Sequence, residues 1–144
     1  MSVRSVYLDT SALVKRYVLE EHSDSVDRIF NRAHAGRIKL GFSVWNIGEI
    51  AVVLDKYEKK SIIENARAVF ERFIGESRLL VRLGQLEIVP LSFRVIIKAV
   101  DYTFKHGIYV ADAVQLASAE GFEGFLTYDR MLAQTAMSEG FKLV

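Results

Sequence analysis

The sequence predicts an α/β fold in which a parallel sheet carries helices on both faces. Short runs of β-branched and aromatic residues alternate along the chain with segments whose apolar residues recur every three or four positions. No Asn-Gly or similar turn dipeptide joins two strand-like runs, so hairpins are not expected. Parallel strands need crossover helices, and this alternation supplies them.

The composition of the 144 residues fits a single domain, 1–144, with one core. No apolar run approaches the roughly 20 residues that cross a bilayer, and the start lacks a signal-peptide pattern, so we expect a cytoplasmic protein with no membrane contact. The absence of cysteine excludes thiol catalysis, disulfides and zinc–thiolate sites. Because the net charge is only +1, a nucleic acid would have to bind a local basic patch.

The N-terminal part of the chain predicts one strand and two helices. The β-branched and aromatic run that ends at Leu8 is the strand, and a helix from Ser11 to about Leu19 follows it directly. Apolar residues spaced three and four apart mark a second helix, with Ser23 as its expected N-cap and Gly36 at its end.

The middle of the chain predicts a strand and two longer helices. Residues 38–42 alternate apolar and polar like a strand, and Ser43 opens a helix whose apolar stripe reaches Tyr57. The longest helical pattern covers 61–83. Gly75 interrupts it, so we expect a break or kink there.

The C-terminal part continues the alternation of strands and helices. The expected strands are 86–91, which includes the only proline, then 125–128 and an edge strand at 141–144. The expected helices are 92–105, capped by Ser92 and ended by Gly107, then 110–120 and 129–138.

Three acids stand where a helix is expected to begin: Asp9, Asp112 and Asp129. Each acid alone is explained by capping of a first helical turn or by the helix dipole. In parallel sheets, however, ligands bind beyond the carboxyl ends of the strands, where the strand order reverses. Because the expected topology brings these helix starts near one edge of the sheet, together they favour a site.

Glu49 is a fourth acid in an unusual position. At helical spacing it falls at the edge of the apolar stripe of the helix that Ser43 opens. It either reaches water or pairs with Lys56 or Arg130, or it belongs to the same site as the other acids. Four carboxylates in one pocket repel each other unless a cation lies among them, and oxygen ligands select Mg²⁺ or Mn²⁺. Such an ion suits phosphoryl chemistry.

Four stretches carry these acids in order: Leu8-Asp9-Thr10-Ser11-Ala12-Leu13-Val14-Lys15, Asn46-Ile47-Gly48-Glu49-Ile50, Asp112-Ala113-Val114-Gln115-Leu116-Ala117 and Leu126-Thr127-Tyr128-Asp129-Arg130. Together, and at these separations, they resemble the PIN domain family, especially the VapC-type toxin nucleases. The resemblance spans nearly the whole chain.

This resemblance implies a three-layer α/β/α sandwich with a mainly parallel central sheet and a Mg²⁺- or Mn²⁺-dependent endoribonuclease site. The implied catalytic and metal-binding residues are Asp9, Glu49, Asp112 and Asp129, supported by Thr10 and Thr127. The resemblance also implies an RNA substrate, a homodimer and, for a toxin of a type II toxin-antitoxin system, a small antitoxin protein.

Two alternatives stay open. PIN domains also act in RNA processing outside toxin-antitoxin pairs, and some are catalytically inert, which would leave an RNA- or protein-binding scaffold. Other enzyme classes lack their motifs here. Ser11 stands where a haloacid-dehalogenase-type phosphatase needs a second aspartate, and neither a phosphate-binding glycine loop nor a G-x-S-x-G elbow occurs.

Weaker signals concern the surface. Lys15, Arg16 and Arg130 are candidate RNA contacts, because basic side chains supply most of the non-specific affinity for phosphates. The three histidines are interpreted as surface residues. The apolar density of 70–86 exceeds what one helix hides against a sheet, so we expect the dimer surface there.

Overall fold

The computed structural model describes residues 3–144 and contains one four-stranded parallel sheet in these residues. The strands are β1 (Ser5–Leu8), β2 (Lys39–Ser43), β3 (Leu86–Val89) and β4 (Gly124–Leu126), in the order β3-β2-β1-β4. The helices are α1 (Thr10–Tyr17), α2 (Ser23–His34), α3 (Val44–Lys59), α4 (Ala66–Arg82), α5 (Phe93–His106), α6 (Val110–Ala119) and α7 (Arg130–Ser138).

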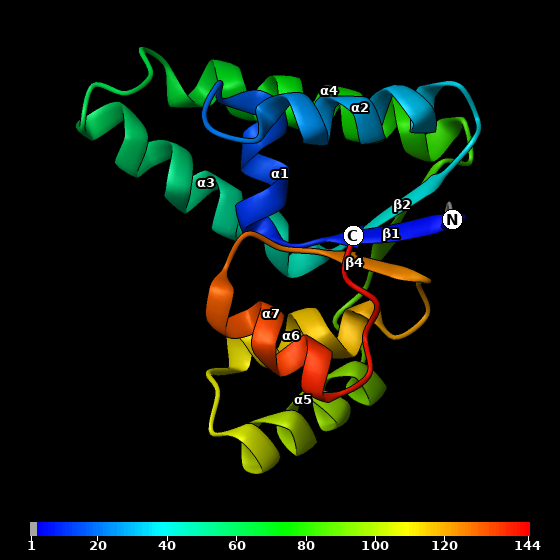
Figure 1. Cartoon of the computed structure of the whole chain (residues 1–144). Coiled ribbons are helices and arrows are strands. Elements are labelled where there is room, and N and C mark those ends of the chain that lie inside the picture. The colour runs from blue at the N-terminus through cyan, green and yellow to red at the C-terminus, as the bar shows by residue number, and fades with distance from the viewer. Residues whose placement is uncertain (1–2) are drawn as a thin grey trace.

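The sheet lies between two layers of helices (Figure 1). Helices α1 to α4 cover one face and α5 to α7 cover the other. Side chains alternate between the faces of a strand, and β1 follows this rule. Val6 and Leu8 enter the core under α1 to α4, whereas Tyr7 enters the core under α5 to α7. The predicted fold class, a three-layer α/β/α sandwich with a parallel sheet, is confirmed.

The joints between strands and helices are short at the carboxyl edge of the sheet. Asp9 alone separates β1 from α1, Ser43 is both the last residue of β2 and the N-cap of α3, and residues 127–129 join β4 to α7. The strand order reverses beside β1, which pairs with β2 on one side and with β4 on the other. This is the place where open α/β sheets bind ligands.

Gly41 of β2 allows an aromatic ring to lie directly on the sheet. A Cβ at this position would be 2.1 Å from the Cζ atom of Phe122, a distance that no side chain tolerates. The Phe122 ring in turn packs edge-on against Tyr7, with ring centroids 5.7 Å apart. A residue with a Cβ at position 41 would therefore displace the ring.

The structure corrects four expectations about elements. Gly75 does not interrupt α4, because it faces solvent and a glycine weakens a helix without breaking its hydrogen bonds. The helix starts later than expected, after its N-cap Asn65, since Ser61 has a φ of 60° that a helix does not accept. Ser23 lies inside α2 rather than capping it. The expected strand at 141–144 makes one isolated bridge, from Leu143 to Phe125.

The expectation of a dimer surface at 70–86 is also wrong in part, because Phe73, Leu80 and Leu86 are buried in the core of the single chain. Within residues 3–144, no helix is both long and apolar enough to cross a membrane.

Candidate active site

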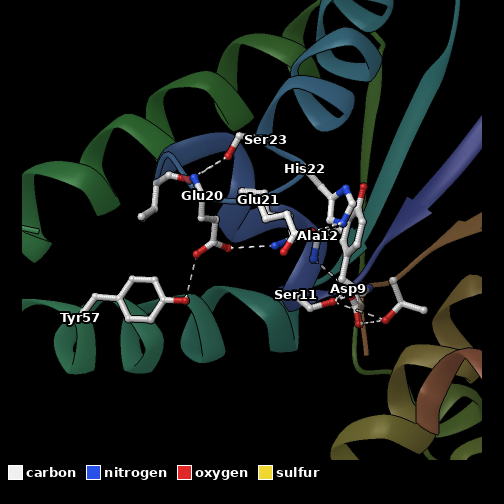
Figure 2. A network of polar contacts seen from close by, with 12 residues as sticks. Asp9, Ser11, Ala12, Glu20, Glu21, His22, Ser23 and Tyr57 are labelled. Carbon is white, nitrogen blue, oxygen red and sulfur yellow. Dashed lines mark hydrogen bonds and ion pairs between the residues drawn. The ribbon is translucent and has the colours of Figure 1, made fainter. Parts of the chain in front are cut away.

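Asp9 is the most enclosed acid of the carboxyl edge, with only 4% of its surface exposed. Its Oδ1 accepts hydrogen bonds from the backbone N–H of Ala12 at 3.0 Å and from the hydroxyl of Ser11 at 2.7 Å. Its Oδ2 accepts from the hydroxyl of Thr127 at 2.5 Å. Figure 2 shows Ser11 and Ala12 beside Asp9 at the start of α1. Asp9 therefore does cap α1, and the cap uses only part of its bonding capacity.

Burial raises the pKa of Asp9 to about 6, although the hydrogen bonds from Thr127, Ser11 and Ala12 act in the opposite direction. The negative charge of Asp129 raises it further. The charged form of a carboxylate is destabilised when the group is buried and lies near a second negative charge, unless a cation compensates it.

Asp129 caps the helix next to Asp9. Its Oδ1 accepts from the backbone N–H groups of Met131 at 2.9 Å and of Leu132 at 3.1 Å, so the capping interpretation holds here too. Its own backbone N–H donates to the Thr127 hydroxyl oxygen at 3.0 Å. Because that oxygen accepts from Asp129, the Thr127 hydrogen is directed to Asp9, and one hydroxyl fixes the two acids relative to each other.

Glu49 lies on the second turn of α3 and is half-buried. Its Oε1 accepts from the hydroxyl of Thr10 at 2.7 Å. Thr10 is the first residue of α1 and follows Asp9 directly. Two adjacent residues therefore belong to the acidic edge, Asp9 as an acid and Thr10 as the partner of Glu49. The contact explains how a carboxylate is accommodated at the flank of an apolar stripe.

Asp112 occupies the first turn of α6 and is also half-buried. Burial raises its pKa, and the negative charges of Asp129 and Glu49 raise it further. The charge of Asp129 therefore acts on both Asp9 and Asp112, and that of Glu49 acts on Asp112, although the four acids come from four different segments.

No group of three or more His, Asp or Glu side chains within residues 3–144 is gathered closely enough to hold a metal ion as it stands. The donor set is nevertheless made of carboxylate and hydroxyl oxygens, which is the chemistry that hard divalent cations select. The sequence expectation of a four-acid metal site thus stays a prediction.

Comparison with known proteins places this arrangement in a family. The family model of the PIN domain matches residues 6–136. The chain belongs to the PIN domain family. A search of curated protein sequences finds no significant relative.

Solved structures share this PIN fold at low sequence identity. VapBC2 from Rickettsia felis, bound to a DNA fragment from its promoter, matches with 17% identity and a TM-score of 0.60 over 97% of both chains. VapC20 of Mycobacterium tuberculosis, described as a Sarcin-Ricin loop cleaving toxin, matches with 14% identity and a TM-score of 0.63 over 94% of this chain and 95% of that one. PAE2754 from Pyrobaculum aerophilum matches with 20% identity and a TM-score of 0.60 over 100% and 92%.

A stack of side chains borders the acids of this PIN domain. The Nζ atom of Lys15 lies 4.9 Å from the ring centroid of Tyr128 and 3.2 Å from a carboxylate oxygen of Glu20. His22 stacks on Tyr128 with ring centroids 5.0 Å apart. Tyr57 donates to the other oxygen of Glu20, and Figure 2 shows this chain of contacts reaching toward His22. His22 is exposed, as expected, but it also borders the site.

The two candidate arginines differ in what they contact. Arg16 makes ion pairs with Glu76 at 2.7 Å and Asp27 at 2.9 Å, on the side of α1 that faces α2 and α4. Arg130 is exposed at the first position of α7, next to Asp129. Of the two, Arg130 is the more accessible to a ligand at the acidic edge of the PIN fold.

An apolar groove of about 690 Å³ opens beside Glu49. It is lined by Thr10, Val44, Trp45, Gly48, Glu49, Val52 and Val53. The acidic edge of the PIN domain therefore continues into a surface that is suited to an apolar group.

Sequence reasoning did not single out three residues that hold the acids: Ser11, Asn46 and Gln115. Ser11 contacts Asp9, while Asn46 donates to Thr10 and to Gln115. A signal existed for Asn46, which is the third residue after the N-cap Ser43, the position where a capping box uses a side chain. Nothing in the sequence pairs Asn46 with Gln115, which lies 69 positions away.

Proposed function

We propose that this PIN domain is a Mg²⁺- or Mn²⁺-dependent endoribonuclease that cleaves RNA phosphodiesters with a metal-activated water. The observation that carries the proposal is Asp9, a charged side chain enclosed at the point where the strand order reverses, with Asp129 adding a second negative charge. Capping alone does not require a buried carboxylate beside a second acid, because Asn or Ser caps a helix without charge.

We propose that Asp9, Glu49, Asp112 and Asp129 supply oxygen ligands to the ion. When bound, it would lower the pKa of a water molecule and neutralise charge on the phosphate. Thr10 bonds one oxygen of Glu49, which leaves the other oxygen for the ligand. Thr127 bonds Oδ2 of Asp9 and leaves one lone pair of that oxygen for the ligand, since Oδ1 already accepts from Ala12 and Ser11. Because no three acids are gathered in the described residues, ion binding would draw them together.

RNA would approach along the exposed side of the acidic edge. Arg130 is the first candidate phosphate contact, since it is exposed beside Asp129. Lys15 and Arg16 are weaker candidates, because their charges are already paired with Glu20 and with Glu76 and Asp27. An RNA substrate is consistent with activity in the cytoplasm.

We further propose that the protein is the toxin of a type II toxin-antitoxin system. The support comes from the neighbours, a VapBC2 complex and a VapC20 toxin that cleaves the Sarcin-Ricin loop. A small antitoxin would cover the acidic edge, and the groove beside Glu49 offers an apolar surface for it. The alternative is that the same site acts in RNA processing, without an antitoxin.

A homodimer is part of the same proposal. Helix α5 exposes apolar side chains at helical spacing along its outer face, and Phe93 and Phe104 are 83% and 86% exposed. Ile97 and Val100 continue this stripe between them. We propose that a second copy of the chain covers it, because a helix pair buries such a stripe on both partners at once.

The test is cleavage of several structured single-stranded RNAs with Mg²⁺ or Mn²⁺, beside an EDTA control. Wild type and Asp9→Asn are purified identically to exclude a contaminating nuclease. Asn still accepts the capping bond from Ala12, so capping predicts equal behaviour, whereas loss of a ligand predicts a rate at least about a hundredfold lower. Equal rates would refute this site, and no cleavage by either protein would favour the inert scaffold.

A further inference from the structure

Asn46 is the most completely bonded polar side chain near the acids, and it is fully buried. Its Oδ1 accepts from the backbone N–H of Ser43 at 2.7 Å, and the Tyr7 hydroxyl lies 3.3 Å away. Its Nδ2 donates to the hydroxyl oxygen of Thr10 at 2.8 Å and to Oε1 of Gln115 at 3.0 Å. Both hydrogens of the amide are thus used, and its oxygen accepts the bond from Ser43.

The backbone N–H of Ser43 determines the direction of every bond that follows. An N–H only donates, so the atom of Asn46 that faces it must be the oxygen, and the amide nitrogen must face Thr10. Because the Thr10 oxygen accepts from Asn46, its hydrogen is free to point at Glu49. The hydrogen-bond chain therefore has one consistent direction, from β2 to the carboxylate of Glu49.

Capping explains only half of the contacts of Asn46. The capping box of α3 needs an acceptor for the N–H of Ser43, which Oδ1 supplies. The two N–H bonds contribute nothing to that cap. They run instead to the first residue of α1 and to Gln115 of α6, three positions after Asp112 and on the same side of that helix. The Tyr7 hydroxyl donates to Oε1 of Gln115 at 2.7 Å.

We infer that Asn46 is a positioning residue of the acidic site, which fixes the carboxylate of Glu49 through the hydroxyl of Thr10. The same amide fastens α6, and with it Asp112, to the start of α3. This inference rests on the proposed function for its consequence in catalysis, but its geometry stands without it. Polar partners behind a ligand orient it and tune its affinity for the metal.

The first test needs neither metal nor RNA. Urea unfolding in EDTA is measured for wild type, Asn46→Ala, Glu49→Ala and the double variant. If Asn46 acts on Glu49, the two effects are not additive, and the coupling changes the unfolding equilibrium constant at least about twofold. Asn46 and Glu49 are three residues apart on one helix, where side chains can also interact directly. The cycle is therefore repeated in a Thr10→Val background, where a coupling that runs through the Thr10 hydroxyl should vanish.

The second test uses Mn²⁺ alone, titrated by calorimetry. Asn46→Ala and Thr10→Val should each weaken Mn²⁺ binding about tenfold or more, the usual effect of removing a partner behind a ligand. Ser43→Ala is the matched control, because it removes the hydroxyl that accepts from Trp45 at the same helix start but leaves the chain to Glu49 intact. Its Mn²⁺ affinity should stay within about twofold of wild type.

The outcomes separate this inference from the proposed function. Additive effects in the first cycle, or a coupling that survives Thr10→Val, would overturn the positioning role. Wild type that binds no Mn²⁺ would refute the proposed metal site, while the unfolding cycle still decides the role of Asn46. If Asn46→Ala does not fold, the cycle is made with Thr10→Val and Glu49→Ala, where additivity would overturn the chain of contacts.

Discussion

Asp9 combines two demands that conflict in the metal-free protein. Its carboxylate caps α1 and accepts two hydroxyl bonds, yet it is enclosed and faces the charge of Asp129. Its raised pKa means that the folded state binds a proton on Asp9 more tightly than the unfolded chain does. The contribution of Asp9 to stability is therefore present at low pH and is lost as the pH rises through about 6.

We therefore predict that the metal-free stability of wild type falls, relative to that of Asp9→Asn, as the pH rises from about 4 to 7. The difference should be on the order of 2–3 kcal/mol, because each unit of pKa shift corresponds to about 1.4 kcal/mol. Urea unfolding of both proteins in EDTA at several pH values measures it. Parallel pH profiles would show that Asp9 is not destabilised by its charge.

Sequence reasoning could place Asp9, Thr127 and Asp129 together, because each directly follows or nearly follows a strand, and parallel strands end at one edge. It could not foresee how Glu49 is held. That depends on Asn46 and Gln115, which meet only when α6 packs against the second face of the sheet. The site residues could thus be predicted from the local order of strands and helices, whereas the residues that hold them depend on the packing of segments far apart in the sequence.

At the scale of elements, Glu76 ties three helices together. Its carboxylate on α4 accepts from Arg16 and Tyr17 of α1 and from His34 of α2. Burial alone would raise the pKa of Glu76, but these bonds outweigh it and lower the pKa to about 2. A lowered pKa stabilises the fold above about pH 4.5, and this stability is lost as the pH falls toward 2.

We predict that Glu76→Gln destabilises the protein by about 2–3 kcal/mol at pH 7, because Arg16 loses its bidentate carboxylate in a half-buried place. The effect should shrink as the pH falls from about 4.5 toward 2, because the stability that the Glu76 carboxylate contributes to wild type is lost over this range. Thermal or urea unfolding at pH 7 and pH 3 checks this. Glu71→Gln, which breaks only an exposed pair with Arg67, is the control and should change stability by less than about 0.5 kcal/mol.

Two glycines should respond to the same substitution in opposite ways. Gly75→Ala should stabilise the protein by about 0.5–1 kcal/mol, because a Cβ there meets nothing within 4 Å and alanine is the better helix former. Gly41→Ala should destabilise it by about 1–3 kcal/mol, because the Cβ would displace the Phe122 ring. Urea unfolding of both variants measures this, and a neutral Gly41→Ala would mean that the ring moves freely.

The element order was predictable, since strand-like and helix-like periods alternate clearly along the chain. The misplaced details had local causes. A solvent-facing Gly75 looks in sequence like a break, although only a buried or strained glycine acts as one. The φ of 60° at Ser61 has no signal in the sequence. Phe73 and Leu80 suggested an exposed surface because the sequence does not show that α4 turns them toward α1 and β2.

At the scale of the whole molecule, the exposed apolar stripe of α5 predicts that the protein assembles into a dimer. Wild type should be a dimer at tens of micromolar by light scattering, and Phe104→Asp should shift it to a monomer, because a charge would be buried at the interface. Leu83→Asp at the C-cap of α4 replaces another exposed apolar residue and should leave the dimer intact. A monomeric wild type, or a dimer unaffected by Phe104→Asp, would contradict the assignment.

The whole fold should also respond to its proposed ion. A cation that binds only the folded protein stabilises it by about 2.7 kcal/mol at a hundredfold excess over Kd, so Mn²⁺ should raise the melting temperature above that in EDTA. Asp9→Asn should lose most of this rise. If wild type melts at the same temperature with and without millimolar Mn²⁺ or Mg²⁺, the result would favour the view that the four acids do not form one metal site.

The short joints at the carboxyl edge limit how the length of this chain can change. Ser43 leads into α3 with no residue between strand and helix, and only Asp9 lies between β1 and α1. One residue inserted between Ser43 and Glu49 would turn the carboxylate by about 100° around the helix axis and carry it away from Thr10. The link 60–65 joins α3 to α4 and contains none of the four acids. Insertions and deletions should therefore be tolerated there, while the strand-to-helix joints keep a fixed length.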